Sequence, residues 1–350
     1  MLKFRALGKT NIDVSEIGFG GWGIGKSMWG DTDDEQSRRT LRKALEVGIN
    51  FFDTAFVYGD GHSERLIGQV LKEARPGSMV GDSPTGKNSA GAGVGSSGHE
   101  LIVATKIPPK DYDWPAKPTT PLKRAYPKDW IISCTERSLK NLQREQIDIQ
   151  QFHVWTDAWL NQDEWKDTVE LLKKQGKIRA FGVSVNDHQP ESALGLVASG
   201  LVDSVQVIYN LFDQFPADEL FPLCEKHNAG VIVRVPFDEG SLAGAFTSET
   251  RFDPSDFRRD YFGGGRLKET LRRIEEIKKD LPEADRDPLA AAALRFCLSH
   301  PAVSTVIPGM RRPGRVVQNV SASGTGLYDL GLLKQLRPHA WKRNFYEFVF

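Results

Sequence analysis

Short apolar runs rich in β-branched residues alternate with longer segments of helical spacing along almost the whole chain. This order of strand, helix and strand is typical of βαβ units, whose strands pair in parallel. Eight runs are predicted to be strands: Glu16–Gly20, Asn50–Asp53, Leu101–Lys106, Ile147–His153, Ile178–Ser184, Ser204–Ile208, Gly230–Val235 and Val303–Ile307. Eight such units can close on themselves, so the pattern predicts an α/β protein of the (β/α)8 TIM barrel class, with an N-terminal hairpin and a C-terminal extension.

The length of the chain is compatible with such a barrel. Its 350 residues exceed the usual limit of about 250–300 residues for one hydrophobic core, so length alone allows two domains or one large barrel. The regular alternation favours one barrel domain over residues 1–350.

Two segments are predicted to be helices, and the first of them carries boundary signals at both ends. Asp33 is placed to cap a helix, Gln36 is placed to complete a capping box with it, and Gly48 is a stop signal. The apolar residues that share one face of this helix are Leu41, Ala44 and Leu45. Residues 130–142 repeat the pattern, with apolar side chains at steps of three and four residues.

Charge and cysteine content exclude several classes of function. Lys+Arg and Asp+Glu both number 46, so nothing in the net charge attracts nucleic acid or an anionic membrane. The chain has neither an apolar signal segment nor a run of about 18 uncharged apolar residues, so we expect it not to enter or cross a membrane. The three cysteines are scattered and form no CxxC pair, which argues against disulfides and favours a reducing cytoplasm.

Three segments are predicted to be long excursions from the barrel. Residues 76–98 are rich in Gly and Ser and have no period, which predicts a mobile insertion on the N-terminal face of the barrel. Residues 108–128 follow the third strand and are expected to overhang the C-terminal face as a substrate wall. Residues 237–265 follow the seventh strand, where loops of this fold often bind phosphate.

Two glycine motifs and the histidines could indicate a Rossmann site, a P-loop or a zinc site, but the surrounding sequence argues against all three. Residues 18–23 match G-x-G-x-x-G, but no helix opens at the third glycine, so a strand-end turn is favoured over a Rossmann site. Residues 81–88 nearly match a P-loop, but Asn88 stands where Mg²⁺ needs Ser or Thr. No histidine pair has the spacing of a zinc site, so we expect no metal.

Four polar residues follow three consecutive predicted strands and should meet at the C-terminal mouth of the barrel. They are Asp53 and Tyr58 after the second strand, Lys106 at the end of the third, and His153 at the end of the fourth. Each has an ordinary alternative as a helix cap, a loop aromatic, a solvated strand end or a half-buried histidine. Their joint arrival at one rim favours a catalytic site.

This combination suits the protonation of an oxygen atom. A free tyrosine has a pKa of about 10, and a nearby ammonium such as Lys106 should lower it by stabilising the phenolate. Asp53 would supply the counter-ion that makes a buried lysine tolerable. His153 could orient a carbonyl oxygen and share the proton relay. We therefore expect a site that protonates an oxygen while another group delivers a hydride.

The segment from Gly48 to Gly68 resembles a signature of the aldo-keto reductase family, and the resemblance extends over nearly the whole chain. It implies a (β/α)8 oxidoreductase with a nicotinamide cofactor, in which Asp53, Tyr58, Lys106 and His153 form the catalytic tetrad and Tyr58 donates the proton. It also assigns cofactor contacts to Gly21, Trp22, Asp53, Ser184, Gln206, Arg234, Pro236, Gly240, Ser241 and Leu242. Arg234 stands where the family often has an aromatic residue that stacks on the nicotinamide, and a planar guanidinium can stack in its place.

The segment after the last strand predicts the choice of cofactor. Arg311 and Arg315 precede or open a helix that continues through Gln318 and Asn319, and guanidinium groups at a helix start suit the 2′-phosphate of NADPH. NADH stays possible, since Gly309-Met310 replaces the family's usual Lys-Ser. Arginines on a solvated helix start are the alternative reading.

We therefore expect an NADPH-dependent enzyme that reduces an aldehyde or ketone. The alternatives are a cofactor-holding redox sensor, as in channel-associated relatives of the family, and an unrelated barrel hydrolase that uses Asp53 with a second carboxylate. A wall of tryptophans would suit an apolar or planar substrate, although each of them could equally be core: Trp22, Trp29, Trp114, Trp155 and Trp159. The sequence leaves the substrate and the oligomeric state open.

Overall fold

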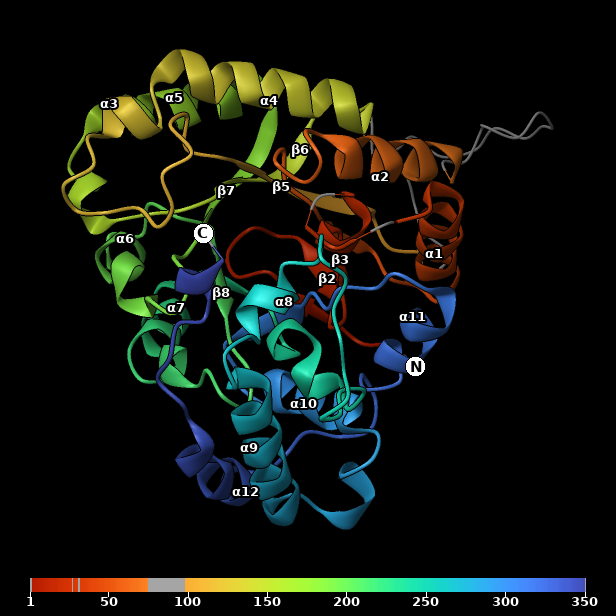
Figure 1. The fold of residues 1–350 in the computed structure, drawn as a ribbon. Coiled ribbons are helices and arrows are strands. Elements are labelled where there is room, and N and C mark those ends of the chain that lie inside the picture. Colours follow the sequence, from red (N-terminus) through yellow and green to blue (C-terminus); the bar gives the residue numbers. More distant parts are fainter. Residues whose placement is uncertain (1, 27, 31, 75–97, 350) are drawn as a thin grey trace.

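The computed structural model describes residues 2–26, 28–30, 32–74 and 98–349 and shows a closed barrel of parallel strands surrounded by helices (Figure 1). The barrel strands are β3 (Phe19–Gly20), β4 (Phe51–Asp53), β5 (Ile102–Ile107), β6 (Ile147–Phe152), β7 (Ile178–Ser184), β8 (Ser204–Ile208), β9 (Gly230–Arg234) and β10 (Val303–Val306). Each pairs in parallel with the next along the chain. The eight predicted strands are thus confirmed.

The ends of this sheet meet and close the barrel. Ile17 bridges Val306 and Gly20 bridges Gly309, both in parallel. The amide of Gly18 donates to the carbonyl of Val306 at 2.8 Å. Because both edge strands are paired, the sheet has no open edge. The (β/α)8 prediction is confirmed.

The N-terminal hairpin closes the floor of the barrel. Its strands β1 (Phe4–Ala6) and β2 (Asp13–Ser15) are antiparallel. Leu7, Ile12 and Val14 are buried in one cluster with apolar side chains of the barrel strands. This end of the barrel is therefore filled with apolar side chains, and polar chemistry is left to the opposite end.

Helices cover the outside of the barrel. They are α1 (Asp34–Glu46), α2 (His62–Glu73), α3 (Leu122–Ala125), α4 (Lys128–Leu142), α5 (Asp163–Lys174), α6 (Leu194–Ala198), α7 (Leu220–His227), α8 (Arg258–Tyr261), α9 (Arg266–Asp280), α10 (Leu289–Leu298), α11 (Pro313–Val320) and α12 (Leu330–Leu336). Asp33 caps α1 by accepting from the amides of Glu35 and Gln36, as predicted. The second half of the capping box does not form, because the Gln36 side chain donates to the carbonyl of Arg311 instead.

The alternation of side chains along the strands points a polar layer into the barrel mouth. Phe51, Ile102, Ile149 and Ile232 belong to the apolar cluster that fills the interior. Side chains two residues apart, or any even number apart, lie on the same face of a strand. The interior therefore changes from apolar to polar near the strand ends, at Asp53, Lys106, Gln151 and Arg234.

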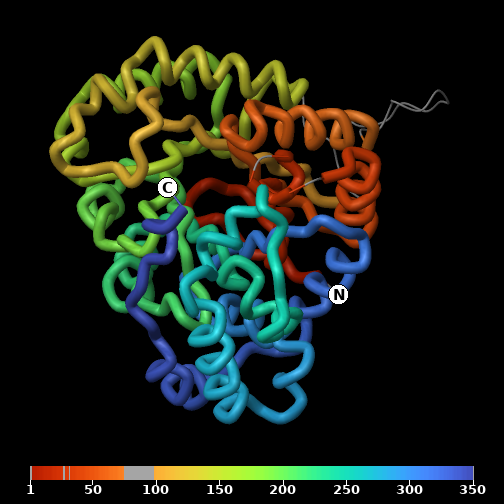
Figure 2. Tube along the Cα trace, in the orientation of Figure 1, coloured from red at the N-terminus to blue at the C-terminus, as the bar shows by residue number. Residues whose placement is uncertain are grey.

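Two of the three predicted excursions lie in the described part of the chain, at the C-terminal end of the barrel. The wall predicted at residues 108–128 and the excursion at residues 237–265 both reach the cavity described below. The predicted insertion at 76–98 lies outside the described residues except for Gly98, and the near-P-loop at 81–88 lies wholly outside them. The tail beyond α12 runs back up the molecule and ends beside the barrel mouth (Figures 1 and 2).

The expectations about membranes, metals and cysteines can be compared with the described part of the chain. None of its helices is long and apolar enough to span a bilayer. It holds no group of three or more His, Cys, Asp or Glu side chains arranged to bind a metal ion. Cys134, Cys224 and Cys297 are buried and form no disulfide.

Candidate active site

A cavity of about 980 Å³ opens at the C-terminal ends of the strands. Most of the predicted site residues line it: Gly21, Trp22, Asp53, Tyr58, His153, Ser184, Gln206, Arg234, Pro236, Gly240, Arg311, Arg315 and Asn319. Four do not reach its wall: Lys106, Ser241, Leu242 and Gln318. The sequence-based assignment therefore describes one continuous pocket with some of its supporting side chains.

Lys106 and Asp53 form a buried ion pair behind the cavity wall. Lys106 Nζ lies 2.6 Å from Asp53 Oδ1 and 2.7 Å from the carbonyl oxygen of Thr54. Gln206 donates to the other carboxylate oxygen at 2.8 Å. Burial raises the pKa of Asp53 and lowers that of Lys106, and the charge of each residue opposes the effect of burial on the other. Asp53 supplies the counter-ion that the sequence predicted.

Tyr58 stands between aromatic neighbours beside this pair. Its ring stacks near Trp22 with centroids 6.1 Å apart and meets His153 edge-on at 5.8 Å. The ammonium nitrogen of Lys106 lies 5.1 Å from the ring centroid. The phenol and the amine are therefore neighbours, although no hydrogen bond from the described residues reaches the Tyr58 hydroxyl.

The prediction that Lys106 lowers the pKa of the phenol is wrong for this structure. Burial raises the pKa of Tyr58 above its ordinary value of 10.0, and the carboxylate of Asp53 raises it further. Arg234 is the nearby cation that works in the opposite direction. The ammonium of Lys106 is paired with the carboxylate of Asp53. Tyr58 is consequently protonated at neutral pH.

His153 presents a neutral imidazole to the cavity. Burial lowers the pKa of His153 well below 6.5, and the charges of Lys106 and Arg234 lower it further. Its Nδ1 atom is buried and has no hydrogen-bond partner among the described residues. A buried polar atom without a partner is costly, and a ligand that bonds to it relieves this cost.

The residues expected to hold a nicotinamide carboxamide fit that group. Gln206 and Ser184 line the cavity next to each other on paired strands, at matching register. The Gln206 Oε1 atom is a buried acceptor with no partner in the described chain, and an amide N–H₂ is a suitable donor for it.

Arg234 lies in the wall next to these residues. Its guanidinium donates to the carbonyl of Val185 at 2.8 Å and to Asp187 Oδ1 at 2.7 Å. These two bonds fix the plane of the group. A planar cation held in this way is suited to lie against a ring, and stacking on the nicotinamide stays a prediction for this position.

Positive charge gathers at the α11 end of the cavity. Arg311, Arg312 and Arg315 all line it, together with Arg258. Burial lowers the pKa of Arg311, and the neighbouring charges of Arg258 and Arg312 lower it further. Mutual repulsion among cations creates a site that favours an anion. Of the other two predicted residues on α11, Asn319 lines the cavity, whereas Gln318 accepts from Arg315 Nη1 at 2.6 Å.

The glycine loop after β9 reaches the cavity only in part. Gly240 lines it with a φ of 104°, which favours glycine. Ser241 instead donates to Asp238 Oδ2 at 2.7 Å, and Leu242 is in the core. The side chains of Ser241 and Leu242 thus support the loop from behind.

The tryptophan wall is smaller than the sequence suggested. Trp22, Trp29 and Trp114 line the cavity. Trp155 and Trp159 are fully buried and pack edge-on against each other at 5.8 Å, so the prediction that they belong to the wall is wrong. They follow β6 but turn outward, into the core between the barrel and its helices.

Several lining residues were missed from the sequence. Asp187, Glu239 and Tyr346 all line the cavity near Arg234. Asn186 also lines it, and its side chain exchanges hydrogen bonds with the backbone of Ala116 in the wall formed by residues 108–128. The sequence carried a signal only for Asp187 and Asn186, which directly follow a predicted strand end.

Comparison with known proteins identifies the family. The sequence model described as "Aldo/keto reductase family" matches residues 16–329. Aldo-keto reductase YhdN of Bacillus subtilis (strain 168) is 30% identical over 317 residues, covering 90% of this chain and 87% of the relative. An NADH-specific methylglyoxal reductase of Escherichia coli (strain K12) is 28% identical, covering 94% of this chain and 95% of the relative.

Further matches come from a plant protein and from a solved structure. A probable voltage-gated potassium channel subunit beta of Arabidopsis thaliana is 26% identical, covering 92% of this chain and 91% of the relative. The holo form of aldo-keto reductase AKR11C1 from Bacillus halodurans superposes with a TM-score of 0.70 at 26% identity, covering 97% of each chain. The sequence match, the fold and the polar layer at the barrel mouth agree, and the chain belongs to the aldo/keto reductase family of oxidoreductases.

Proposed function

We propose that this oxidoreductase reduces an aldehyde or ketone to an alcohol with NADPH and uses Tyr58 as the general acid. The observation that carries the proposal is the meeting of a protonated phenol, a neutral imidazole and a buried ammonium at one end of the cavity. The Tyr58 and His153 rings are 5.8 Å apart, and Lys106 Nζ lies 5.1 Å from the Tyr58 ring.

The roles of the side chains follow from their protonation states. Tyr58 keeps its proton at neutral pH because burial and Asp53 raise the pKa of the phenol. When bound, the reduced nicotinamide supplies the hydride. As the carbonyl oxygen gains negative charge, Tyr58 Oη passes its proton to that oxygen. The resulting phenolate is stabilised by the cation of Arg234, and His153 orients the oxygen through a ring nitrogen.

The choice of NADPH rests on the arginines at the α11 end of the cavity. Arg311, Arg312 and Arg315 form a cationic surface that suits a 2′-phosphate, which NADH lacks. A relative from Escherichia coli is NADH-specific, so the preference for NADPH is tested by measuring activity with both cofactors. We expect kcat/KM to be at least about tenfold higher with NADPH, which corresponds to about 1.4 kcal/mol.

Replacement of Tyr58 by Phe tests the assignment of the acid. Tyr58→Phe should bind NADPH with a Kd within about twofold of the wild type, whereas kcat should fall by roughly 10² or more. Tyr328→Phe is a matched control, because the Tyr328 hydroxyl lies outside the cavity. Turnover by Tyr58→Phe close to that of the control would show that another group donates the proton.

A redox-sensing subunit is the second candidate function, favoured by the likeness to a probable channel subunit beta. The two functions differ in the fate of bound NADPH. Stopped-flow mixing of the NADPH complex with a panel of aldehydes and ketones should show rapid oxidation that depends on the carbonyl compound. Oxidation that is slow and insensitive to every carbonyl compound would favour the sensor.

A further inference from the structure

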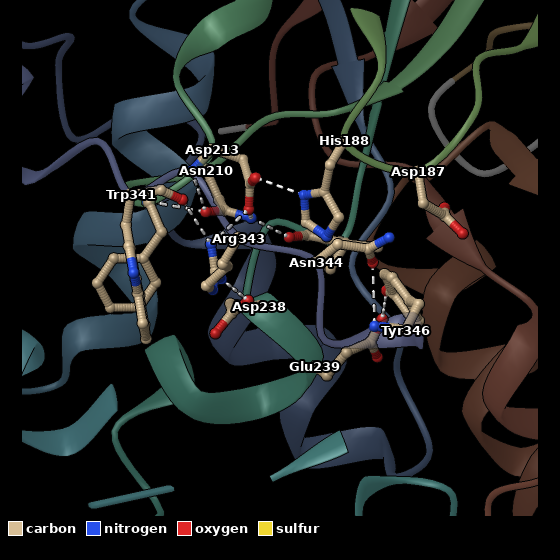
Figure 3. Close-up of polar contacts among 12 residues, drawn as sticks. Asp187, His188, Asn210, Asp213, Asp238, Glu239, Trp341, Arg343, Asn344 and Tyr346 are labelled. Atoms are coloured by element: carbon tan, nitrogen blue, oxygen red, sulfur yellow. Dashed lines mark hydrogen bonds and ion pairs between the residues drawn. The ribbon is translucent and has the colours of Figure 1, made fainter. Parts of the chain in front are cut away.

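The C-terminal segment, residues 341–346, returns to the barrel mouth and contributes to the cavity wall. The amide of Trp341 donates to the carbonyl of Phe212 at 2.8 Å, which attaches the segment to the loop after β8. Tyr346, at its other end, is buried and lines the cavity. Figure 3 shows Arg343 of this segment among the polar side chains of Asn210, Asp213 and Asp238.

Arg343 is the centre of this cluster and connects loops that follow different strands. Its side chain is only 3% exposed and pairs with Asp213 at 3.3 Å and, in closer contact, with Asp238. Asp213 also pairs with His188 Nδ1 at 2.6 Å (Figure 3). His188, Asp213 and Asp238 follow β7, β8 and β9 respectively, so the guanidinium joins the loops after β8 and β9 directly and the loop after β7 through Asp213.

The loop after β9 adopts a backbone conformation that needs such support. Val235, Asp238 and Glu239 have φ angles of 52°, 45° and 54°, in the left-handed region that L-residues rarely adopt. A β-branched residue such as Val235 is especially disfavoured there. Strained backbone of this kind persists only when the surrounding structure holds it in place.

The side-chain contacts that hold this loop come from three other parts of the chain: the loop after β8, helix α8 and the C-terminal segment. Asn210 donates to the carbonyl of Val235 at 2.9 Å, and Tyr261 donates to Asp238 Oδ1 at 3.1 Å. The other two come from the C-terminal segment: Arg343 pairs with Asp238, and the Tyr346 hydroxyl donates to Glu239 Oε1. The chain that is held in this way lines the cavity through Pro236, Glu239 and Gly240.

We propose that Arg343 and Tyr346 are positioning residues for cofactor binding, acting through the 235–240 loop. The C-terminal segment holds this loop in its strained conformation, and in that conformation the loop forms the cavity wall between Arg234 and the arginines of the α11 end. Without the segment, the loop relaxes and the wall loses its shape. The nature of the ligand, a nicotinamide dinucleotide, rests on the proposed function.

The test is a titration of the full-length protein with NADPH, followed by intrinsic fluorescence or calorimetry. Arg343→Met should raise the Kd by about tenfold or more, and Tyr346→Phe, which removes one hydroxyl, by about three- to tenfold. For Arg343→Met, kcat at saturating NADPH should stay within about twofold, because Arg343 lies outside the cavity wall and acts only through the loop. Arg343→Lys should recover part of the affinity, since an ammonium keeps the charge but cannot bridge two carboxylates with a planar fork.

Arg295→Met is the matched control for general destabilisation. Arg295 also forms a largely buried ion pair, with Asp285, but it lies outside the cavity wall. Arg295→Met should lower the melting temperature and leave the Kd for NADPH unchanged. If Arg343→Met does not fold, Tyr346→Phe decides, because it keeps the ring and changes one atom.

Two outcomes would overturn the proposal, and they are distinguishable. A Kd within twofold of the wild type for both Arg343→Met and Tyr346→Phe would make the segment merely structural, while the proposed function would stand. A wild-type protein that binds neither NADPH nor NADH would remove the proposed function together with this inference.

Discussion

The ammonium of Lys106 lies 2.6 Å from a carboxylate oxygen of Asp53, and both side chains are almost completely buried, at 0% and 3% exposure. An uncompensated charge in such a place is strongly destabilising. We therefore expect Asp53→Asn to lower the free energy of unfolding by about 3–5 kcal/mol, measured by urea denaturation at neutral pH. Stability equal to that of the wild type would mean that the ammonium finds another counter-ion.

A double variant distinguishes destabilisation by an unpaired buried charge from destabilisation by altered packing. Asp53→Asn combined with Lys106→Met removes both charges of this pair, and a neutral pair of similar size often restores stability. The double variant should therefore be more stable than Asp53→Asn alone. Losses that simply add, to within about 0.5 kcal/mol, would show that the two side chains are not coupled.

Gly59 fixes the turn that carries Tyr58. Its φ is 67°, and a Cβ atom there would lie 1.9 Å from the carbonyl oxygen of Gly25. Gly176 has a similar φ of 70° but open space around it, which makes it a matched control. Both alanine substitutions carry the cost of a left-handed residue, about 1–2 kcal/mol, but only Gly59→Ala must displace the turn.

We expect Gly59→Ala to reduce kcat/KM for carbonyl reduction by about tenfold or more, because a displacement near 1 Å is enough to disturb an acid. Gly176→Ala should keep kcat/KM within about twofold. Equal losses of activity in the two variants would mean that left-handed strain, and not the position of Tyr58, causes the effect.

The sequence predicted those parts of the site that local patterns determine. The alternation of side chains along a strand and the common polarity of parallel strands were sufficient to bring Asp53, Lys106 and His153 to one rim. The pKa of Tyr58 could not be predicted, because its direction depends on burial and on how fully Asp53 compensates Lys106. Trp155 was misassigned for the same reason, since burial depends on neighbours distant in the chain.

The C-terminal part of the cavity could not be predicted from the sequence. Arg343 and Asp213 are 130 residues apart, and a single ion pair over that distance leaves no periodic pattern. Glu239 and Tyr346 are separated by 107 residues. Only the packing of the tail on the barrel mouth brings these residues together.

Glu239 should make stability depend on pH. Burial raises its pKa from 4.5 to about 7, and the charge of Asp238 adds to this, whereas Tyr346, Arg258 and Arg234 oppose it. The folded protein therefore holds a proton on Glu239 that the unfolded chain releases above pH 4.5. Its contribution is fully present below that pH and is lost as the pH rises to about 7, on the order of 3 kcal/mol in total.

Glu239→Gln removes this titration and keeps the shape of the side chain. The melting temperature of the wild type should fall relative to that of the variant as the pH rises from 4.5 to about 7. A difference between the two melting temperatures that stays constant over this range would show that Glu239 is already ionised at the lower pH.

Arg315 provides the test of cofactor choice, because its guanidinium is exposed at the start of α11 and lines the cavity. If it binds the 2′-phosphate, Arg315→Ala should raise the KM for NADPH by about tenfold, the size of one charge-assisted contact, and leave the KM for NADH within about twofold. Arg251→Ala is a suitable control, since Arg251 is exposed and lies outside the cavity wall. Added salt should raise the KM of the wild type for NADPH more than its KM for NADH. Raising the ionic strength from 0.1 to 1 M shortens the Debye length from about 10 to 3 Å, which weakens the attraction between the arginine and the 2′-phosphate. An equal rise of KM for both cofactors in Arg315→Ala would place Arg315 near a group that they share, such as the pyrophosphate. Arg315 would then not be the residue that favours NADPH over NADH.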